Sequence, residues 1–370
     1  MSARPDNPAA GRQGGRRPGP PAGGERHDPL LQVDDLTVHF RIRRGLRKRS
    51  DDIVHAVDHV SLRIGAGRTL ALVGESGCGK STVARAVLQL VKPTLGTISF
   101  MGTDLAALRA GARRAMMRDA QVVFQDPYSS LNPRMTVHDL VAEPLRANSR
   151  LTGRELEDRV LALLEMVGLG TQHLWRRPHE FSGGQCQRIA IARALALEPR
   201  LVVLDEPTSA LDVSVQARIL VLLNELQERL GLAYLFIAHD LAVVQSISHD
   251  VAVMYLGHVV EAGPAEQVFG RPRHPYTAAL LASVPSPDPE ARTAMRVLEG
   301  DVPSAIAPPA GCRFHPRCPF CLNVCRADEP QPHDVGGRRV ACHLPDDTDV
   351  TRGGLPAVEN AAALSPADGS

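Results

Sequence analysis

The sequence lacks a long hydrophobic run. No stretch of the 370 residues approaches the roughly 18–20 apolar residues that a membrane-spanning helix requires. Residues 1–24 are rich in Arg, Pro and Gly and hold no apolar run, so they do not resemble a secretory signal. We therefore expect a cytosolic chain, although one that can lie against a membrane.

The sequence also lacks an excess of charge of one sign. Its 42 basic and 41 acidic residues give a net charge of +1, so the composition offers no general attraction to nucleic acid. With 44% hydrophobic and 22% charged residues, wholesale disorder is excluded. Lysine is scarce, because only Lys48, Lys80 and Lys92 are present and all other basic residues are Arg. The presence of a lysine at position 80, in a chain that otherwise uses Arg, indicates chemistry that needs an ammonium group there.

Short apolar strands alternate with helices in the second half of the chain. We expect strands at Leu201–Leu204, Tyr234–Ile237 and Val251–Tyr255, with helices at Asp212–Leu230 and Leu241–Ser248 between them. This alternation is typical of an α/β protein with a mainly parallel sheet covered on both faces. Upstream of these elements, we expect strands at Leu31–Phe40, twice between Val54 and Val73, at Thr97–Phe100 and at Gln121–Phe124. The stretch between the last two strands is polar. We expect helices at Lys80–Leu90, at Arg154–Val167, where the pattern is amphipathic, and from Ser182 to about Leu197.

A phosphate-binding loop lies between the strand Thr69–Val73 and the following helix. The residues that we expect at the nucleotide are Gly74, Glu75, Ser76, Gly77, Cys78, Gly79, Lys80, Ser81 and Thr82, of which the first eight match G-x-x-x-x-G-K-[ST]. Glycines let backbone N–H groups turn toward phosphate oxygens, and the helix N-terminus adds partial positive charge. Lys80 is expected to reach the β- and γ-phosphates, and Ser81 to bind Mg²⁺. The same surroundings are expected to lower the thiol pKa of Cys78, without a catalytic role for it.

Three further strand ends carry polar side chains. A buried strand ends at Asp205 and Glu206, which places both carboxylates beside the phosphate loop. Asp205 can hold Mg²⁺, and Glu206 can orient and deprotonate the attacking water. His239 and Gln125 end two other predicted strands, where ligands of parallel sheets gather. We expect catalytic roles for Glu206, His239 and Gln125, with a metal or water contact from Gln125.

A second glycine-rich turn precedes a helix N-terminus at Ser182, Gly183, Gly184 and Gln185. Such a turn is a second anion site. One site cannot use two such loops, about a hundred residues apart, unless they approach from different directions. We therefore expect two copies of the domain head to tail, each phosphate loop closed by the other copy's turn. No internal repeat is visible, so one chain carries one nucleotide-binding unit.

These motifs, and the order in which they occur along the chain, resemble those of the ATP-binding subunits of ABC transporters. The resemblance covers about Leu30 to Leu344 and includes a D-loop at 209–212 that ends in Asp212, a further nucleotide contact. It implies a P-loop NTPase of ABC type, with a mainly parallel core, an antiparallel β subdomain, a helical subdomain and a small Cys-rich C-terminal extension. It also implies ATP and Mg²⁺ as ligands.

A narrower resemblance is to the oligopeptide/dipeptide permease ATPases. It rests on the runs 124–135, 179–188 and 237–241, and on His274-Pro275-Tyr276-Thr277, Gly311-Cys312 and Arg317-Cys318-Pro319. Within that group the chain is similar to the F-type subunit. The resemblance implies peptide import, two membrane permease subunits, a second ATPase of D type, an extracytoplasmic peptide-binding protein, no nucleic acid, and a place on the cytoplasmic face of the cell membrane. The family's adenine-stacking aromatic residue corresponds to Phe40 or to His55, and both assignments stay open.

The Cys-rich part of the chain permits several interpretations. Five of the seven cysteines lie between Cys312 and Cys342, and in a reducing compartment such residues favour metal ligation over disulfides. Four thiolates suit a [4Fe–4S] cluster or a structural zinc, and a metal-free lobe is the third alternative. Cys321 offers a C-x2-C pair with Cys318. The family resemblance implies that Cys312, Cys318, Cys325 and Cys342 hold an iron–sulfur cluster of structural importance.

The domain organisation follows from these patterns and from the resemblance. We expect a disordered tail over 1–28, an ABC ATP-binding domain over 29–270 with its helical subdomain at about 126–182, a C-terminal extension over 271–345, and a disordered tail over 346–370. The alternative function is a soluble ABC-type ATPase that acts on ribosomes or DNA. Such proteins generally carry two nucleotide domains or a long coiled-coil insertion, and neither is visible in this sequence.

Overall fold

The computed structural model describes residues 28–42, 52–283 and 300–351. Within them, an eight-stranded sheet has the strand order β11-β12-β10-β9-β3-β8-β7-β6. Its strands are β3 (Thr69–Val73), β6 (Ala120–Val123), β7 (Leu201–Asp205), β8 (Ala233–Ala238), β9 (Asp250–Tyr255), β10 (His258–Pro264), β11 (His333–Asp334) and β12 (Arg339–Val340). The five strands from β9 to β6 are parallel, which confirms the predicted parallel core. Strands β10, β12 and β11 extend it in antiparallel fashion.

A second, antiparallel sheet lies over the phosphate-loop helix. Its strands, in the order β2-β1-β4-β5, are β1 (Leu31–Ile42), β2 (Asp52–Ile64), β4 (Leu95–Phe100) and β5 (Thr103–Asp104). Helix α1 (Lys80–Val87) buries Val83 and Val87 in a core shared with both sheets. This packing holds the N-terminus of α1 at a constant place relative to the strand ends, which is a requirement for a phosphate site.

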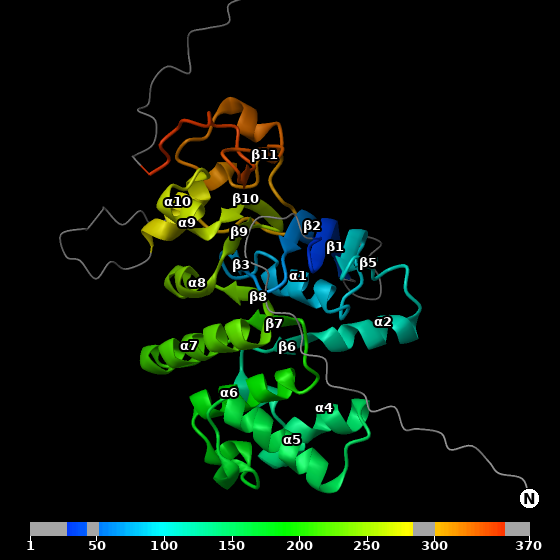
Figure 1. The fold of residues 1–370 in the computed structure, drawn as a ribbon. Coiled ribbons are helices and arrows are strands. Elements are labelled where there is room, and N and C mark those ends of the chain that lie inside the picture. The colour runs from blue at the N-terminus through cyan, green and yellow to red at the C-terminus, as the bar shows by residue number, and fades with distance from the viewer. Residues whose placement is uncertain (1–27, 43–51, 284–299, 352–370) are drawn as a thin grey trace, which may run out of the picture.

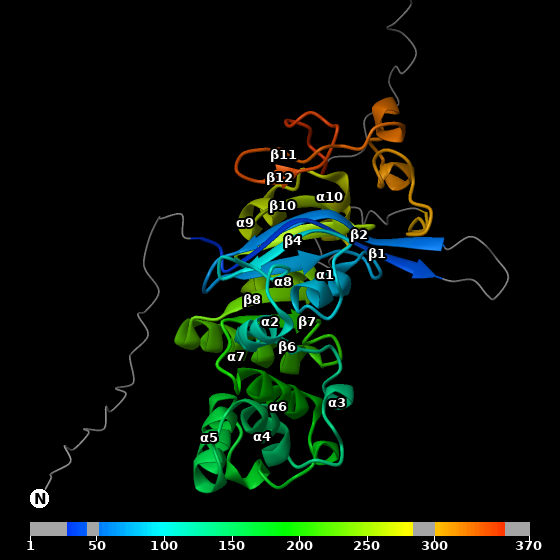
Figure 2. The same ribbon diagram turned by 90° about the vertical axis from the view of Figure 1, so that its right-hand side faces the viewer.

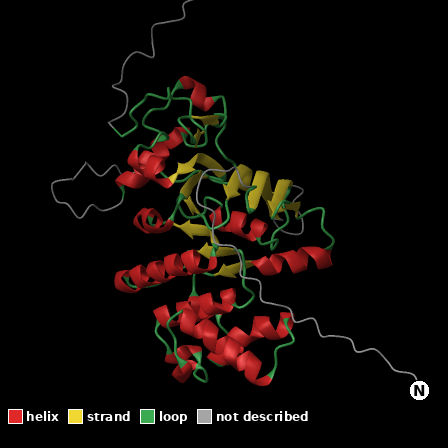
Figure 3. Ribbon diagram, viewed as in Figure 1, coloured by secondary structure: helices red, strands yellow, loops and turns green. Residues whose placement is uncertain are grey.

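A helical layer lies at one end of the molecule, at the bottom of Figures 1 and 3. It contains α3 (Pro127–Ser130), α4 (Val137–Asn148), α5 (Gly153–Met166) and α6 (Gly183–Leu195), next to α7 (Val213–Leu230). The predicted amphipathic helix is confirmed as α5, whose buried face is Leu156, Val160, Leu163 and Leu164. Short 3-10 turns complete the connections, namely η1 (Met117–Asp119), η2 (Thr171–His173), η3 (Pro178–Glu180), η4 (His315–Arg317) and η5 (Asn323–Arg326).

Several helices were not predicted, and two of them show how local signals fail. Helix α2 (Ala110–Met116) lies in the stretch interpreted as merely polar, and it buries no residue, so it has no apolar stripe to reveal it. Helix α4 contains Pro144, a residue that argues against a helix interior, yet six of its residues are buried in the helical layer. Tertiary packing therefore overrides the local signal in α4.

The C-terminal part lies at the opposite end from the helical layer (Figure 2). Helices α8 (Leu241–Ile247), α9 (Ala265–Gly270) and α10 (Pro275–Ala282) lead to residues 300–351, which we call the C-terminal module. The described chain continues past the boundary expected at 345, because Val350 is buried against Phe320 and Leu344. The predicted tails lie almost wholly outside the described residues. No helix in the described ranges has the length and hydropathy needed to cross a membrane.

Candidate nucleotide-binding site

The phosphate loop leaves the carboxyl end of β3 and enters α1 at Gly79. Two of its glycines are required by their surroundings. Gly74 has φ +149°, and a Cβ there would lie 2.1 Å from the carbonyl oxygen of Met254. Gly79 has φ +110°, and a Cβ there would lie 2.3 Å from the carbonyl oxygen of Ala56. Only a residue without a side chain permits this close approach of backbone to backbone.

Lys80 lies along the inside of the loop. Its side chain is buried, and Nζ donates hydrogen bonds to the carbonyl oxygens of Gly74, at 2.7 Å, and Glu75, at 3.0 Å. The ammonium is therefore held at the centre of the loop. The expectation for Cys78 was wrong, since burial raises the pKa of its thiol despite the neighbouring Lys80. Desolvation of the thiolate outweighs the attraction of one ammonium.

A pair of oxygen ligands suited to Mg²⁺ lies beside the loop. The Ser81 hydroxyl donates to Oδ1 of Asp205 at 3.2 Å, so the first residue after Lys80 meets the end of β7. Burial raises the pKa of Asp205, and the adjacent Glu206 raises it further. A divalent cation would relieve both effects, and hydroxyl and carboxylate oxygens are ligands that Mg²⁺ prefers.

The side chain of Glu206 contacts two side chains that follow the neighbouring strands. Gln125 follows β6 and donates from Nε2 to Oε2 of Glu206 at 2.8 Å, while His239 follows β8 and places Nδ1 3.3 Å from the same oxygen. Glu206 has a φ of 49°, an uncommon conformation for a residue with a side chain. Such backbone strain is concentrated at functional sites, because it aims a side chain in an otherwise unfavoured direction.

These groups surround one cavity of about 540 Å³. Its lining residues are Val54, Ala56, Ser76, Gly77, Gly79, Lys80, Ser81, Thr82, Gln125, Glu206, His239 and Ala305. Most of the predicted phosphate-loop residues and all three predicted catalytic residues are therefore brought together. Sequence reasoning missed Val54, Ala56 and Ala305, since small apolar residues carry no motif.

The second glycine-rich turn lies elsewhere. Ser182 caps α6, where its hydroxyl accepts from the backbone N–H of Gln185 at 3.4 Å, and its side chain is exposed. Ser182, Gly183, Gly184, Gln185 and Asp212 do not line the cavity of their own chain. Asp212 is also exposed, at the N-terminus of α7. A single copy thus exposes Ser182 and Asp212 outside the cavity of its own phosphate loop, whereas Gly184 is buried.

Comparison with family models gives two matches. The ABC transporter model matches residues 57–209, which include the phosphate loop, the helical layer and the Asp205–Glu206 strand. The model described as the oligopeptide/dipeptide transporter C-terminal region matches residues 260–325. The two matches follow one another along the chain, and the second begins within β10.

Curated relatives match over most of their length. A probable peptide ABC transporter ATP-binding protein of Sinorhizobium fredii is 52% identical over 319 residues, with 86% of this chain and 90% of that protein covered. The oligopeptide transport ATP-binding protein OppF of Salmonella typhimurium is 51% identical, with 83% and 93% covered. The dipeptide transport ATP-binding protein DppF of Escherichia coli is 46% identical, with 86% and 95% covered.

A solved structure agrees with this assignment. The dimeric, post-hydrolysis structure of an ATP-binding cassette bound to ADP and Pi matches with a TM-score of 0.57 at 30% identity, over 64% of this chain and 99% of that one. The α/β prediction of an ABC-type cassette is thereby confirmed. The chain belongs to the family of ABC transporter ATP-binding subunits and carries the C-terminal region typical of oligopeptide and dipeptide transporters.

Proposed function

We propose that this chain hydrolyses ATP to power the import of peptides through a membrane permease. The observation that carries the proposal is the meeting of Gln125, Glu206 and His239 at a cavity that also contains the buried Lys80. The names of the relatives support peptides as cargo. No feature favours the alternative of a ribosome- or DNA-directed ATPase, and the net charge of +1 argues against a nucleic-acid partner.

Each predicted residue takes a defined role in this proposal. Backbone N–H groups of the loop and the Lys80 ammonium hold the phosphates, and Ser81 and Asp205 hold Mg²⁺, which neutralises charge on the phosphate oxygens. Glu206 accepts a proton from the attacking water, and Gln125 and His239 hold its carboxylate in place. Glu206 is anchored from two sides, so its position changes little during the reaction.

The working site is composite in this proposal. The Ser182–Gln185 turn, whose Ser182 is exposed, closes with Asp212 the phosphate loop of a second cassette arranged head to tail. A related cassette is solved as a dimer with ADP and Pi, which supports this arrangement. The second cassette is a D-type ATPase, and the remaining partners are two permease subunits and an extracytoplasmic peptide-binding protein. The complex places this chain on the cytoplasmic face of the membrane.

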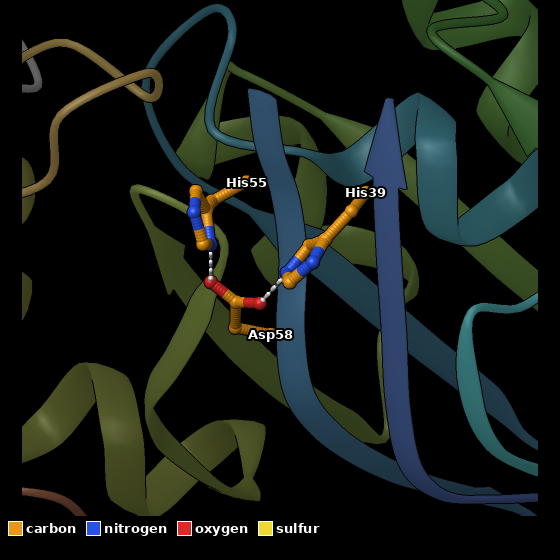
Figure 4. Close-up of side chains that lie close together, drawn as sticks. All are labelled: His39, His55 and Asp58. Carbon is orange, nitrogen blue, oxygen red and sulfur yellow. Dashed lines mark hydrogen bonds and ion pairs between the residues drawn. The ribbon is translucent and has the colours of Figure 1, made fainter. Parts of the chain in front are cut away.

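Phe40 is the better of the two candidates for stacking on adenine. Strand pairing puts Phe40 opposite Val54, which lines the cavity, and residues paired across antiparallel strands project on the same face. Phe40 is partly exposed, at 40%, so its ring is free to take a flat partner. His55 is instead paired with His39, and its ring faces Asp58 (Figure 4).

The cysteines of the C-terminal module fit an iron–sulfur cluster better than a single zinc ion. Burial, and to a lesser degree the nearby thiols of Cys342, Cys312 and Cys325, raise the pKa of Cys318 to about 12. Of the described residues, the group close enough to share one metal ion contains no cysteine. A cluster spans more space than one ion, and it would replace the thiol protons and join distant parts of the module.

Two measurements test these proposals. The chain reconstituted in proteoliposomes with its permease subunits, the second ATPase and the peptide-binding protein should release phosphate from ATP and take up peptide, and Lys80→Ala should abolish both. Phosphate release without any peptide uptake would reject the assignment of cargo. Protein purified without oxygen should be brown, with about four irons per chain for a Cys₄-ligated cluster. Colourless protein with one zinc per chain would reject the cluster, and protein without metal would reject both metals.

A further inference from the structure

The C-terminal module contacts the phosphate loop directly. Arg317 of the module donates from Nη1 and Nη2 to the two carboxylate oxygens of Glu75, at 2.8 Å and 3.1 Å. The two residues are separated by 242 positions in the sequence. The Arg317 side chain is only 6% exposed and that of Glu75 25%, so this is a largely buried, two-bond ion pair. Such paired bonds fix orientation as well as charge.

Every polar group of Glu75 has a partner from outside its own residue. Its backbone N–H donates to the hydroxyl of Tyr276 at 2.8 Å, and its carbonyl oxygen accepts from Lys80. The carboxylate completes the set with Arg317. Tyr276 belongs to α10 and Arg317 to η4, so two elements of the C-terminal part hold the second residue of the phosphate loop.

Arg317 itself is firmly placed. The Phe314 ring packs against those of Tyr255 and Tyr276, with centroids 5.2 Å and 5.4 Å away. Arg313, at the other end of this short segment, donates to Oδ2 of Asp58 at 2.5 Å and to the carbonyl oxygen of Leu256 at 2.6 Å. The segment between Arg313 and Arg317 is thus fastened to the ATP-binding domain at both ends.

The Asp58 anchor is a polar cluster rather than an independent metal site. His39 and His55 approach its carboxylate from two sides, as Figure 4 shows, and the three ligand atoms lie within 4.8 Å of one another. The guanidinium of Arg313 already neutralises the same carboxylate, and a divalent cation there would meet its positive charge. Burial acts to raise the pKa of Asp58, but the neighbouring His258, His39 and Arg313 lower it well below its ordinary value. The cluster therefore serves to fasten Arg313.

The charge of Glu75 explains why its contact with Arg317 affects ATP binding. A carboxylate in a loop that binds a triphosphate repels the nucleotide unless a cation neutralises it. The hydrogen bonds that Arg317 donates to Glu75 raise the pKa of Arg317 above its ordinary value, so the guanidinium keeps its charge. Without Arg317, the carboxylate of Glu75 would be partly buried, unpaired and free to turn toward the phosphates. The loop would then keep only two of the three contacts that hold Glu75, those with Tyr276 and Lys80.

We propose that Arg317 is a positioning residue of the nucleotide site, through which the C-terminal module fixes and neutralises Glu75 in the phosphate loop. This inference rests on the proposed binding of ATP. The module is then part of the nucleotide site rather than an appendage.

The test is equilibrium binding of fluorescent mant-ATP and mant-ADP to the full-length protein. Arg317→Gln should weaken mant-ATP binding about 10-fold, as expected for loss of one charged hydrogen-bonding partner. The loss should be smaller for mant-ADP, because repulsion grows with the charge of the nucleotide. Arg317→Lys should recover part of the affinity. Glu75→Gln combined with Arg317→Gln should recover most of it, since the unpaired carboxylate is then gone.

Arg338→Gln is the matched control. Arg338 is equally buried in the same module and pairs with the buried Glu261 at 3.5 Å, away from the phosphate loop. The Arg338→Gln substitution should lower the melting temperature of the protein without weakening mant-ATP binding. The inference is overturned if folded Arg317→Gln binds mant-ATP normally, if Arg338→Gln weakens binding equally, or if the double variant recovers nothing. Should Arg317→Gln fail to fold, Arg317→Lys takes its place under the same criteria. Wild-type protein that fails to bind mant-ATP would instead overturn the proposed function, and this inference with it.

Discussion

Glu206→Gln isolates the proton-accepting role of Glu206 from its structural role. Glutamine has the same shape, and its amide oxygen can still accept the hydrogen bond that Gln125 donates at 2.8 Å. The unusual φ of 49° at this position is a property of the loop that follows β7 and is expected to persist. The phosphate loop is untouched, so ATP should bind as in the wild type. The substitution removes only the ability to take a proton.

The expected loss follows from this isolation. General-base catalysis contributes about 10²–10⁴-fold, so turnover should fall at least ~10²-fold, or about 2.7 kcal/mol in activation free energy. Phosphate release in a single turnover measures the chemical step, and mant-ATP binding measures the ground state. Glu228→Gln, on the exposed face of α7, is the control for a carboxylate lost away from the cavity. Near-normal turnover in Glu206→Gln, with intact ATP binding, would refute the base role.

Three further outcomes are expected. Ser182→Arg should abolish hydrolysis in the complex and leave nucleotide binding by the isolated chain intact, and equal hydrolysis by isolated monomers would contradict the composite site. Gly79→Ala should lower stability by at least about 1–3 kcal/mol in a denaturant titration, because its Cβ would meet Ala56 in a strained conformation. Burial acts to lower the pKa of His258, yet the carboxylates of Asp58, 3.9 Å from Nε2, and Glu329, 3.0 Å from Nδ1, raise it above 6.5. Its stabilising effect is therefore complete below pH 6.5 and is lost as the pH rises through the folded-state pKa, with a slope of at most about 1.4 kcal/mol per pH unit. His258→Gln should remove this part of the pH dependence of thermal unfolding, and an unchanged dependence would contradict it.

The sequence predicted most of the nucleotide site because its parts are local. The phosphate loop is a continuous motif between a strand and a helix, so its conformation is set by neighbouring residues. Asp205, Glu206 and His239 end apolar strands, and parallel strands bring their carboxyl ends to one edge. Gln125 was located by the same reasoning, and its bond to Glu206 agrees with it.

Local signals failed where burial is decided by distant parts of the chain. Helix α4 packs into the helical layer in spite of Pro144, and α2 lies on the surface without an apolar stripe. The environment of Cys78 was misjudged for the same reason. Its position beside Lys80 was visible in the sequence, whereas the burial that raises the pKa of its thiol was not.

The family, the mainly parallel character of the core sheet and the phosphate-loop motif follow from patterns within short segments. The contact of Arg317 with Glu75 does not, because the two residues are 242 positions apart and neither belongs to a pattern that points to the other. The choice of Phe40 over His55 likewise depended on the register of β1 against β2. Periodicity and motifs report which face of an element is buried, but only the packed structure determines which buried faces meet.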